Sequence, residues 1–350
     1  MKSEVKILKL FDAHVHLRHD NSRILQEVVI PTAKVCKYAV IMPNTSPPTI
    51  SHNDVVWYRD QILFFSKQYP DFNPLMMIKM ESNCDPELIR SVKNVGAIGT
   101  KSYPEGVTTN SSKGLAEEVI NNPPQNLLDC WEEQSKNGMI SSWHGEMPKS
   151  FVMDGEKDFL PFISWLANQY PKLKIILEHI STADAVDLIL NKNPHNNIAA
   201  TITYHHLILT LDDVLKHNIY PHNYCKPVVK TPRDREFLVK AVLSGHPNFF
   251  LGSDSAPHCV KAKENCWGCA GIYSSPVLVQ GLAEFFDSHD ALDKMENFTS
   301  IYGARFYGLP LWEESITLIR KRFSVFAPFN EFGFTPFRVA HDFGWGLKDD

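Results

Sequence analysis

Eight short β-prone segments alternate with helical stretches along the chain, and this alternation restricts the fold more than any other feature. The segments span residues 7–16, 38–42, 75–79, 97–102, 140–144, 174–179, 198–203 and 249–253. Strands that alternate with helices pair in parallel through right-handed crossovers. Eight such units within about 300 residues are typical of a closed barrel. The sequence therefore predicts an α/β protein built as a (β/α)₈ TIM barrel.

Helix signals separate these segments. Asp85 and Pro86 supply a capping residue and an N-terminal proline. Thr231 and Pro232 repeat this arrangement before a helix expected over 233–243. A further helix is expected over 183–190, with four residues facing the sheet: Ala185, Val186, Ile189 and Leu190.

The chain carries no sign of an internal boundary. No Gly/Ser linker, charge block or repeat divides its 350 residues, which predicts one domain over 1–350. Only about a dozen residues precede the first histidine pair, too few for a second domain. Residues 310–350 form an aromatic-rich extension, which we expect to pack on the barrel or on a partner subunit because a large exposed aromatic patch is unusual.

Composition excludes several classes of protein. The 35 basic and 40 acidic side chains leave a net charge of −5, without the basic excess of nucleic-acid-binding proteins. No apolar run is long enough for a membrane span, and the first residues lack a secretory signal, so a cytoplasmic protein is expected. Seven scattered cysteines do not form a disulfide framework. Cys266 and Cys269, with Cys259 nearby, lack the second ligand pair of a zinc knuckle, so loop thiols are the better interpretation.

Polar side chains gather at the carboxyl ends of the predicted strands. In a (β/α)₈ barrel these ends meet at one mouth, where active sites are built. The side chains are His14, His16, Asn44, Lys101, His144, His179 and Asp254. Residues far apart in sequence are therefore expected to share one pocket.

Several of these side chains are suited to bind a metal ion. His14 and His16 are two apart in a strand, so both imidazoles point to the same face. His144, His179 and Asp254 add ligands of types that Zn²⁺ accepts, although ligand type alone leaves Mn, Fe and Co open. Each residue singly is equally consistent with a hydrogen-bonded histidine or a capping aspartate. Together they predict a metal site.

Lys101 is expected at the same mouth. Desolvation and nearby cations favour the neutral amine, which can add CO₂ to form a carbamate able to bridge two metal ions. The alternative is an unmodified lysine that pairs with substrate or with a carboxylate.

A set of motifs in a fixed order carries a resemblance to a known family. The motifs are DAHVHLR, VIMPNTSPP, TKSYPEGVTTNSSKG, HGE, LEHIST, HNYCKP, GSDSAPH, GCAG and YGLP. They run through some 300 residues, and in this set the chain resembles the amidohydrolase superfamily, specifically the short bacterial type of dihydroorotase. In two places the chain departs from the family pattern: Lys226 replaces the usual leucine, and Trp143 replaces a smaller aliphatic residue.

The resemblance implies a role for each motif residue. It implies two Zn²⁺ ions per subunit, bridged by N6-carboxylated Lys101 and a hydroxide. One ion would be held by His14, His16 and Asp254, and the other by His144 and His179. The substrate contacts would come from Arg18, Asn44 and His258 at its carboxylate, the backbone of Lys226 and Ala270 at its ring amide, and Thr108 and Thr109 in a lid over 104–114. It also implies a homodimer.

The implied activity is the reversible cyclisation of N-carbamoyl-L-aspartate to L-dihydroorotate in pyrimidine (UMP) biosynthesis. By hypothesis, the hydroxide attacks the ring amide, and Asp254 acts as general base and then general acid. When the charges of the two metal ions and their ligands are added, the net charge of the metal site is near +1 before Arg18 is counted. A positive site favours an anionic substrate. Two alternatives stay open: another cyclic-amide hydrolase, of hydantoinase or allantoinase type, and a catalytically inactive barrel that serves as a scaffold.

Overall fold

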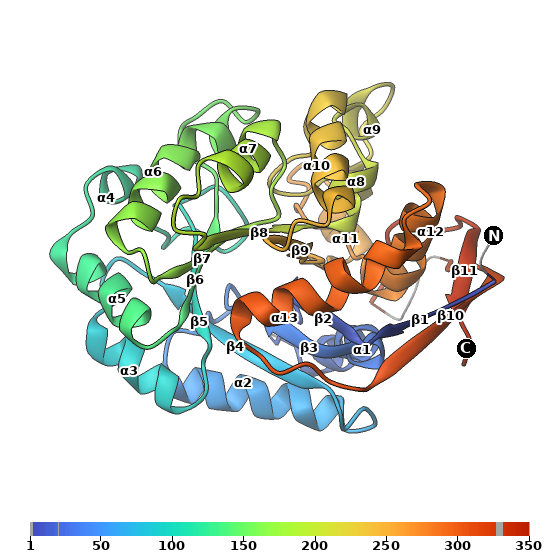
Figure 1. The fold of residues 1–350 in the computed structure, drawn as a ribbon, viewed down its shortest axis with the longest axis horizontal. Helices are drawn as coiled ribbons and strands as arrows, with labels where there is room; N and C mark the ends of the chain where they lie inside the picture. Colours follow the sequence, from blue (N-terminus) through green and yellow to red (C-terminus); the bar gives the residue numbers. More distant parts are fainter. Residues whose placement is uncertain (1–2, 20, 327–331, 350) are drawn as a thin grey trace.

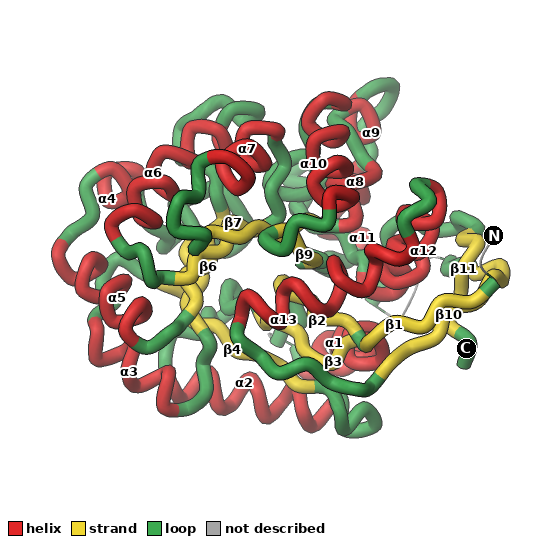
Figure 2. Tube along the Cα trace, in the orientation of Figure 1, coloured by secondary structure: helices red, strands yellow, loops and turns green. Residues whose placement is uncertain are grey.

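Eight parallel strands form the centre of the protein in the computed structural model, which describes residues 3–19, 21–326 and 332–349. They follow one another around the sheet in chain order from β2 to β9. Figures 1 and 2 show these strands enclosed by helices. The strands are β2 (Leu10–Val15), β3 (Cys36–Ile41), β4 (Asn73–Met80), β5 (Gly99–Ser102), β6 (Ile140–His144), β7 (Lys174–Glu178), β8 (Ile198–Ile202) and β9 (Phe249–Leu251).

The sheet closes on itself just beyond the end of β9. Val15 at the end of β2 pairs in parallel with Ser255. The N–H of Asp254 donates to the carbonyl of His14 over 2.9 Å, and the N–H of His16 donates to the carbonyl of Ser255 over 3.1 Å. The predicted TIM barrel is therefore confirmed. The hydrogen bonds that close it involve three of the predicted site residues, His14, His16 and Asp254.

Helices cover the outside of the barrel. They are α1 (Ser22–Val35), α2 (His52–Phe65), α3 (Pro86–Asn94), α4 (Glu117–Asn121), α5 (Gln125–Lys136), α6 (Gly155–Gln169), α7 (Ala183–Asn191), α8 (Tyr204–Ile208), α9 (Asp212–Leu215), α10 (Pro232–Ser244), α11 (Val260–Lys263), α12 (Leu278–Ser288) and α13 (Tyr302–Tyr307), with short 3₁₀ turns at Pro221–Asn223, Ser275–Val277 and Leu292–Lys294 and a π-helical turn at Asn297–Ile301. None of the helices in the described residues is long and apolar enough to cross a membrane.

The predicted helix starts are confirmed at α3 and α10. The carboxylate of Asp85 accepts a hydrogen bond from the N–H of Leu88 over 2.8 Å. Thr231 and Asp234 form a reciprocal capping box, and Gly245 ends α10 in the left-handed conformation at φ 74°. The expectation for Leu190 was wrong, because this side chain is 43% exposed at the end of α7 rather than packed on the sheet.

The first predicted strand, 7–16, is two strands that belong to different sheets. The chain leaves β1 (Glu4–Leu8) at Lys9, whose N–H donates to the carbonyl of Glu314 over 2.8 Å. β1 then pairs antiparallel with β10 (Ser315–Phe323), and β10 pairs with β11 (Phe343–Leu347). Both ends of the chain thus meet in a small three-stranded sheet beside the barrel (Figure 1). Periodicity alone could not locate this break, because both strands are apolar on their inner faces.

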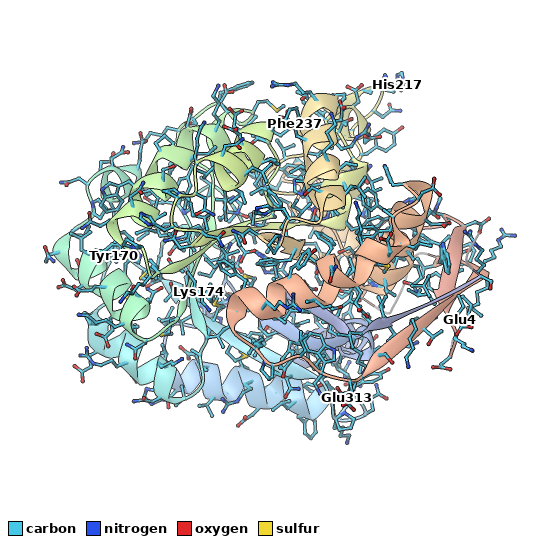
Figure 3. The ribbon with its side chains drawn as sticks, in the orientation of Figure 1. Glu4, Tyr170, Lys174, His217, Phe237 and Glu313 are labelled. Carbon is cyan, nitrogen blue, oxygen red and sulfur yellow. The ribbon has the colours of Figure 1, made fainter. Side chains whose placement is uncertain are left out.

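The small sheet covers its inner face with apolar side chains. Val5 and Ile7 of β1 are buried, whereas Glu4 is exposed at the rim of the molecule, where Figure 3 labels it. Several aromatic residues of the tail are also buried: Phe334, Phe337, Phe343 and Trp345. Residues 327–331 of the predicted extension lie outside the described residues.

The barrel interior is filled from its amino end. Phe11 of β2 and Phe250 of β9 belong to one buried cluster with Ala304 of α13 and Trp312. Gly303 lies so close that an added Cβ would come within 2.4 Å of the Phe11 ring, so this position requires glycine. Since α13 covers this end, the carboxyl end of the barrel remains as the place for a pocket.

Candidate active site

A narrow cavity lies at the carboxyl ends of the barrel strands. It is lined by His14, His16, Arg18, Asn44, Tyr103, Thr108, Thr109, His144, His179, Lys226, Asp254, Ala256, Ala270 and Gly271. Every site residue expected from the sequence lines this cavity except Lys101 and His258. Lys101 is fully buried behind the lining, and His258 contacts Arg18. The predicted convergence of distant residues on one mouth is therefore present in the structure.

Three of the expected ligands form one compact group. Nε2 of His14 lies 3.3 Å and Nε2 of His16 lies 3.1 Å from Oδ1 of Asp254. The two imidazole Nε2 atoms are 3.3 Å apart. All three ligand atoms face one point, and a divalent cation placed there would replace these contacts with coordination bonds.

His144 and His179 lie beside this group. The ring centroids of His144 and His179 are 4.8 Å apart, and those of His14 and His179 are 5.0 Å apart. Nδ1 of His179 is buried and has no hydrogen-bond partner in the described structure, whereas Nε2 of His144 lies 2.7 Å from a carboxylate oxygen of Glu146. A buried ring nitrogen without a partner is costly unless a ligand occupies it.

Backbone strain concentrates at the same place. His179 has φ 41°, Asp254 has φ 43° and Arg18 has φ 49°, all in the left-handed region that side chains with a Cβ rarely adopt. Strained residues of this kind persist where the surrounding structure holds them, and they cluster at functional sites.

Burial determines the protonation of the imidazoles. Desolvation lowers the pKa of His14 and of His144, and it brings the pKa of His16 and of His179 well below the usual value. All four rings are therefore neutral near pH 7 and present lone pairs, which is the form that binds metals.

Lys101 is a buried amine behind the cavity lining. Its side chain is fully buried, and Nζ has no hydrogen-bond partner in the described structure. Burial lowers the pKa of Lys101 to about 8, so part of the population carries a neutral amine near pH 7. An unpartnered buried amine fits a group that becomes a carbamate and poorly fits a structural ion pair.

Sequence reasoning missed Glu178. This buried carboxylate lies with Oε2 3.0 Å from Nδ1 of His14, and it accepts hydrogen bonds from Thr201 over 2.6 Å and from Ser142. Burial acts to raise the pKa of Glu178, but the contact with His14 and the charge of Lys101 outweigh it and lower the pKa to about 2. The available signal was a glutamate inside an apolar strand, directly before His179.

Asp12, a polar residue in an apolar run, is a second residue that sequence reasoning did not assign to the site. It accepts hydrogen bonds from the N–H of Ser253 over 2.8 Å and from the N–H of His14 over 3.1 Å. Burial raises the pKa of Asp12 to about 7. These bonds connect β2 to the segment after β9 and so fix His14 relative to Asp254.

Arg18 and His258 form a cationic corner of the pocket. Nη2 of Arg18 lies 3.0 Å from Nε2 of His258, and Nε donates to the carbonyl of Pro257 over 3.3 Å. Burial first, and then the charge of Arg18, lower the pKa of His258 to about 2, so this imidazole is neutral. Arg18 thus brings one guanidinium charge to the cavity, and the neutral ring of His258 contacts it.

The loop 104–114 lies against the pocket through Asn44. The side-chain amide of Asn44 donates to the carbonyl of Thr109 over 3.1 Å, and the amide of Asn110 donates to the carbonyl of Asn44 over 2.9 Å. Thr108 and Thr109 line the cavity. This reciprocal pair of bonds holds the loop over the pocket.

Comparison with protein families places this geometry in a known context. The model of the amidohydrolase family matches residues 5–311, which include every residue of the pocket. The chain belongs to the amidohydrolase family. Members of this family use a metal cofactor, and the converging ligand group described above is consistent with that property.

The similarity extends over the whole length of several dihydroorotases. A dihydroorotase from Pseudoalteromonas atlantica is 40% identical over 346 residues, which cover 96% of this chain and 97% of the relative. The crystal structure of Saccharomyces cerevisiae dihydroorotase in complex with 5-fluoroorotic acid superposes with a TM-score of 0.91 at 31% identity and covers 99% of both chains. Campylobacter jejuni dihydroorotase gives a TM-score of 0.90 at 33% identity over 99% of this chain and 98% of that one. The resemblance inferred from the motifs is confirmed.

Proposed function

We propose that this chain is a dihydroorotase that interconverts N-carbamoyl-L-aspartate and L-dihydroorotate in pyrimidine biosynthesis. The observation that carries the proposal is the presence of two sites in one cavity. The ligand group of His14, His16 and Asp254 shares this cavity with the guanidinium of Arg18, which His258 contacts. A metal site beside a carboxylate-binding corner suits a cyclic amide that carries a free carboxylate.

The residues present fit a pair of zinc ions. His14, His16 and Asp254 would hold one ion, and His144 and His179 the other, with carboxylated Lys101 between them. The neutral imidazoles and the unpartnered atoms of Lys101 and His179 support this assignment. When bound, zinc supplies a Lewis acid that polarises the amide carbonyl and makes water acidic enough to ionise near pH 7.

The protein side chains would orient the substrate. The planar guanidinium of Arg18 offers two parallel N–H donors to the substrate carboxylate, and Asn44 and His258 lie beside it. Lys226 and Ala270 also line the cavity, and their backbone would meet the ring amide. These contacts fix the amide carbon against the ligand group.

Asp254 would transfer the proton during ring opening. Its carboxylate is buried, and desolvation raises its pKa, which makes it a better base than an exposed aspartate. It accepts the proton of the attacking water and delivers it to the ring nitrogen as the carbon–nitrogen bond breaks. The reverse sequence closes the ring of carbamoyl aspartate with loss of water.

The loop 104–114 would act as a lid. Its hydrogen bonds with Asn44 hold Thr108 and Thr109 against the pocket, and opening would break this pair of bonds together with the bond from Nζ of Lys79 to the carbonyl of Asn110. A closed lid excludes water and positions the substrate.

We further propose, on the basis of the resemblance, that the protein is a cytoplasmic homodimer. A measurement of its molar mass in solution tests the dimer.

A direct assay tests the proposed activity. We expect the zinc-loaded protein to hydrolyse dihydroorotate and to cyclise carbamoyl aspartate, with little activity on hydantoin, because hydantoin has no carboxylate for Arg18. A preference for hydantoin would favour the alternative of another cyclic-amide hydrolase. Failure to bind metal or to turn over any of these compounds would favour the inactive scaffold.

A further inference from the structure

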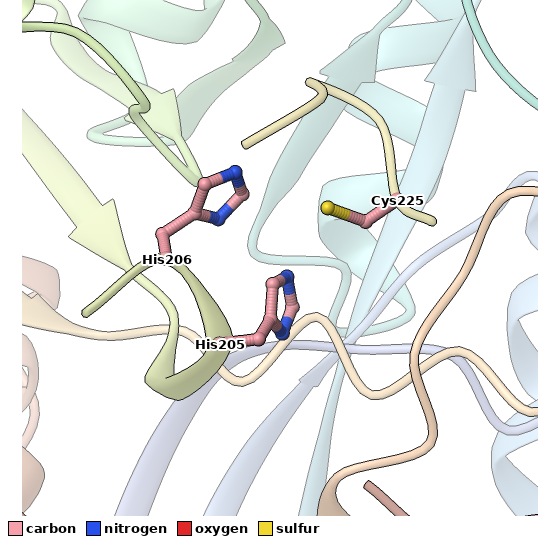
Figure 4. Close-up of side chains that lie close together, drawn as sticks. All are labelled: His205, His206 and Cys225. Carbon is pink, nitrogen blue, oxygen red and sulfur yellow. The ribbon is translucent and has the colours of Figure 1, made fainter. Parts of the chain in front are cut away.

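A second group of metal-ligating side chains lies outside the proposed zinc pair. His205, His206 and Cys225 are buried, and one ligand atom from each lies within 4.8 Å of the others. Figure 4 shows the Cys225 sulfur and the two imidazole rings turned toward a common space. None of the three residues lines the catalytic cavity.

Two separate segments bring this group together. His205 and His206 lie on α8, which begins directly after β8, and the Thr203 hydroxyl caps this helix by accepting from the N–H of His206 over 3.0 Å. Cys225 follows the 3₁₀ turn Pro221–Asn223 and directly precedes Lys226. The group therefore spans the gap between the end of a barrel strand and the segment that borders the pocket.

His205 gives independent evidence for a ligand. The residue is fully buried, and neither ring nitrogen has a hydrogen-bond partner among the described residues. The centroid of its ring is 4.8 Å from that of His206 and 6.3 Å from that of Phe337 in the C-terminal extension. A buried imidazole normally satisfies at least one nitrogen, so this ring lacks a partner that its surroundings do not supply.

The other two side chains share one acceptor. Nε2 of His206 and Sγ of Cys225 lie 3.1 Å and 3.2 Å from the carbonyl oxygen of Pro227. Nδ1 of His206 lies 2.8 Å from the hydroxyl of Thr203. A metal bound at Nε2 would replace the contact with the Pro227 carbonyl, and the Thr203 hydroxyl on Nδ1 would keep the ring in place, as in many zinc sites.

We propose that His205, His206 and Cys225 form a third metal site that binds Zn²⁺. Two imidazoles and a thiolate select zinc over hard cations such as Mg²⁺ or Ca²⁺, and the Pro227 carbonyl or a water completes four ligands. On binding, Cys225 loses its thiol proton to solvent, and sulfur donates the freed electron pair to the metal. Small side-chain rotations bring the three ligand atoms to the separation of about 3.5 Å that tetrahedral zinc requires.

The site would have a structural role next to the pocket. It joins α8 to the segment that continues into Lys226, which lines the catalytic cavity. Phe337 packs against His205, so the C-terminal extension closes the site on one side. The site is independent of the proposed activity, because its residues neither line the cavity nor belong to the ligand group of His14.

Cobalt substitution tests this proposal without an activity measurement. The proposed catalytic pair contains no sulfur ligand, so Co²⁺ there gives no thiolate-to-cobalt charge-transfer absorption. We expect the full-length protein reconstituted with Co²⁺ to show this near-ultraviolet band and to hold three metal ions per chain. Both the band and one metal ion should be lost in Cys225→Ser and retained in Cys36→Ser, which changes a buried thiol at the start of β3.

Two further variants complete the experiment. The double variant Cys266→Ser/Cys269→Ser should retain the band, which separates Cys225 from the thiols of the neighbouring loop. His205→Gln keeps every thiol and should lose the third metal ion, so it decides the matter if Cys225→Ser fails to fold. No thiolate band in the wild-type protein, or a band that survives both Cys225→Ser and His205→Gln, would overturn the proposal. If only the catalytic pair failed to load, the band would remain with a single metal ion.

Discussion

Nδ1 of His14 lies 3.0 Å from the carboxylate of Glu178, and both side chains are buried. This contact turns the opposite nitrogen, Nε2, toward Asp254 and the cavity, where it lies 3.3 Å from Oδ1. A carboxylate behind an imidazole fixes the ring orientation and raises its basicity as a ligand. Glu178 therefore acts on the metal site without lining the cavity.

The substitution Glu178→Gln should weaken metal binding. The amide keeps the size of the side chain but removes the charge that orients His14, and we expect a loss of roughly 10- to 100-fold in metal affinity. Competition with a chelator measures this change. Glu87→Gln, which changes an exposed glutamate in the first turn of α3, is the matched control. Unchanged affinity in Glu178→Gln would contradict the assigned role.

Metal loading should depend on pH through Lys101. Burial lowers the pKa of Lys101 to about 8, and only the neutral amine can add CO₂. In the metal-free protein supplied with bicarbonate and Zn²⁺, the rate of loading should therefore rise with pH and level off above about 8. Stopped-flow or timed metal analysis measures it, and Lys101→Met should lack both the rise and the second zinc ion. A rate that is flat with pH, or a midpoint near 10, is incompatible with carbamate formation at this residue.

Arg18→Lys should impair substrate binding more than turnover. Lysine keeps the charge but loses the planar pair of donors, so we expect KM for dihydroorotate to rise roughly 10- to 100-fold with a smaller change in kcat. Steady-state kinetics measure both constants. Arg23→Lys on the exposed face of α1 is the control. A fall in kcat at constant KM would argue against a carboxylate clamp.

Asp254→Asn should separate binding from chemistry. Asparagine cannot carry the proton, so we expect kcat to fall by at least about 100-fold while substrate binding is largely retained. Metal content is measured in parallel, because Asp254 is also a proposed ligand. Near-normal turnover would show that another group transfers the proton.

The barrel and the members of its site were predictable from the sequence because each strand carries its own local signal. The spacing of two between His14 and His16 predicts that both side chains lie on the same face of a strand, and His179 ends an apolar run. The parallel order of the strands then brings residues such as His14 and Asp254 together without any long-range information beyond the fold.

The supporting residues were not predictable in the same way. Glu178 and Asp12 act through partners that are distant in the sequence, Thr201 in β8 for one and Ser253 just after β9 for the other. The group of His205, His206 and Cys225 depends on how α8 packs against the segment after the 3₁₀ turn Pro221–Asn223, which no local pattern encodes. The break at Lys9 likewise depends on pairing between β1 and β10, elements more than 300 residues apart in the printed sequence.

The central claim is that side chains from separate strands hold two metal ions at one mouth. An anomalous-scattering map of crystals grown with zinc tests it most directly. The account predicts two peaks at the mouth, one beside His14, His16 and Asp254 and one beside His144 and His179, with electron density for a carboxylated Lys101 between them. A single peak, or two peaks with an unmodified lysine, would contradict it.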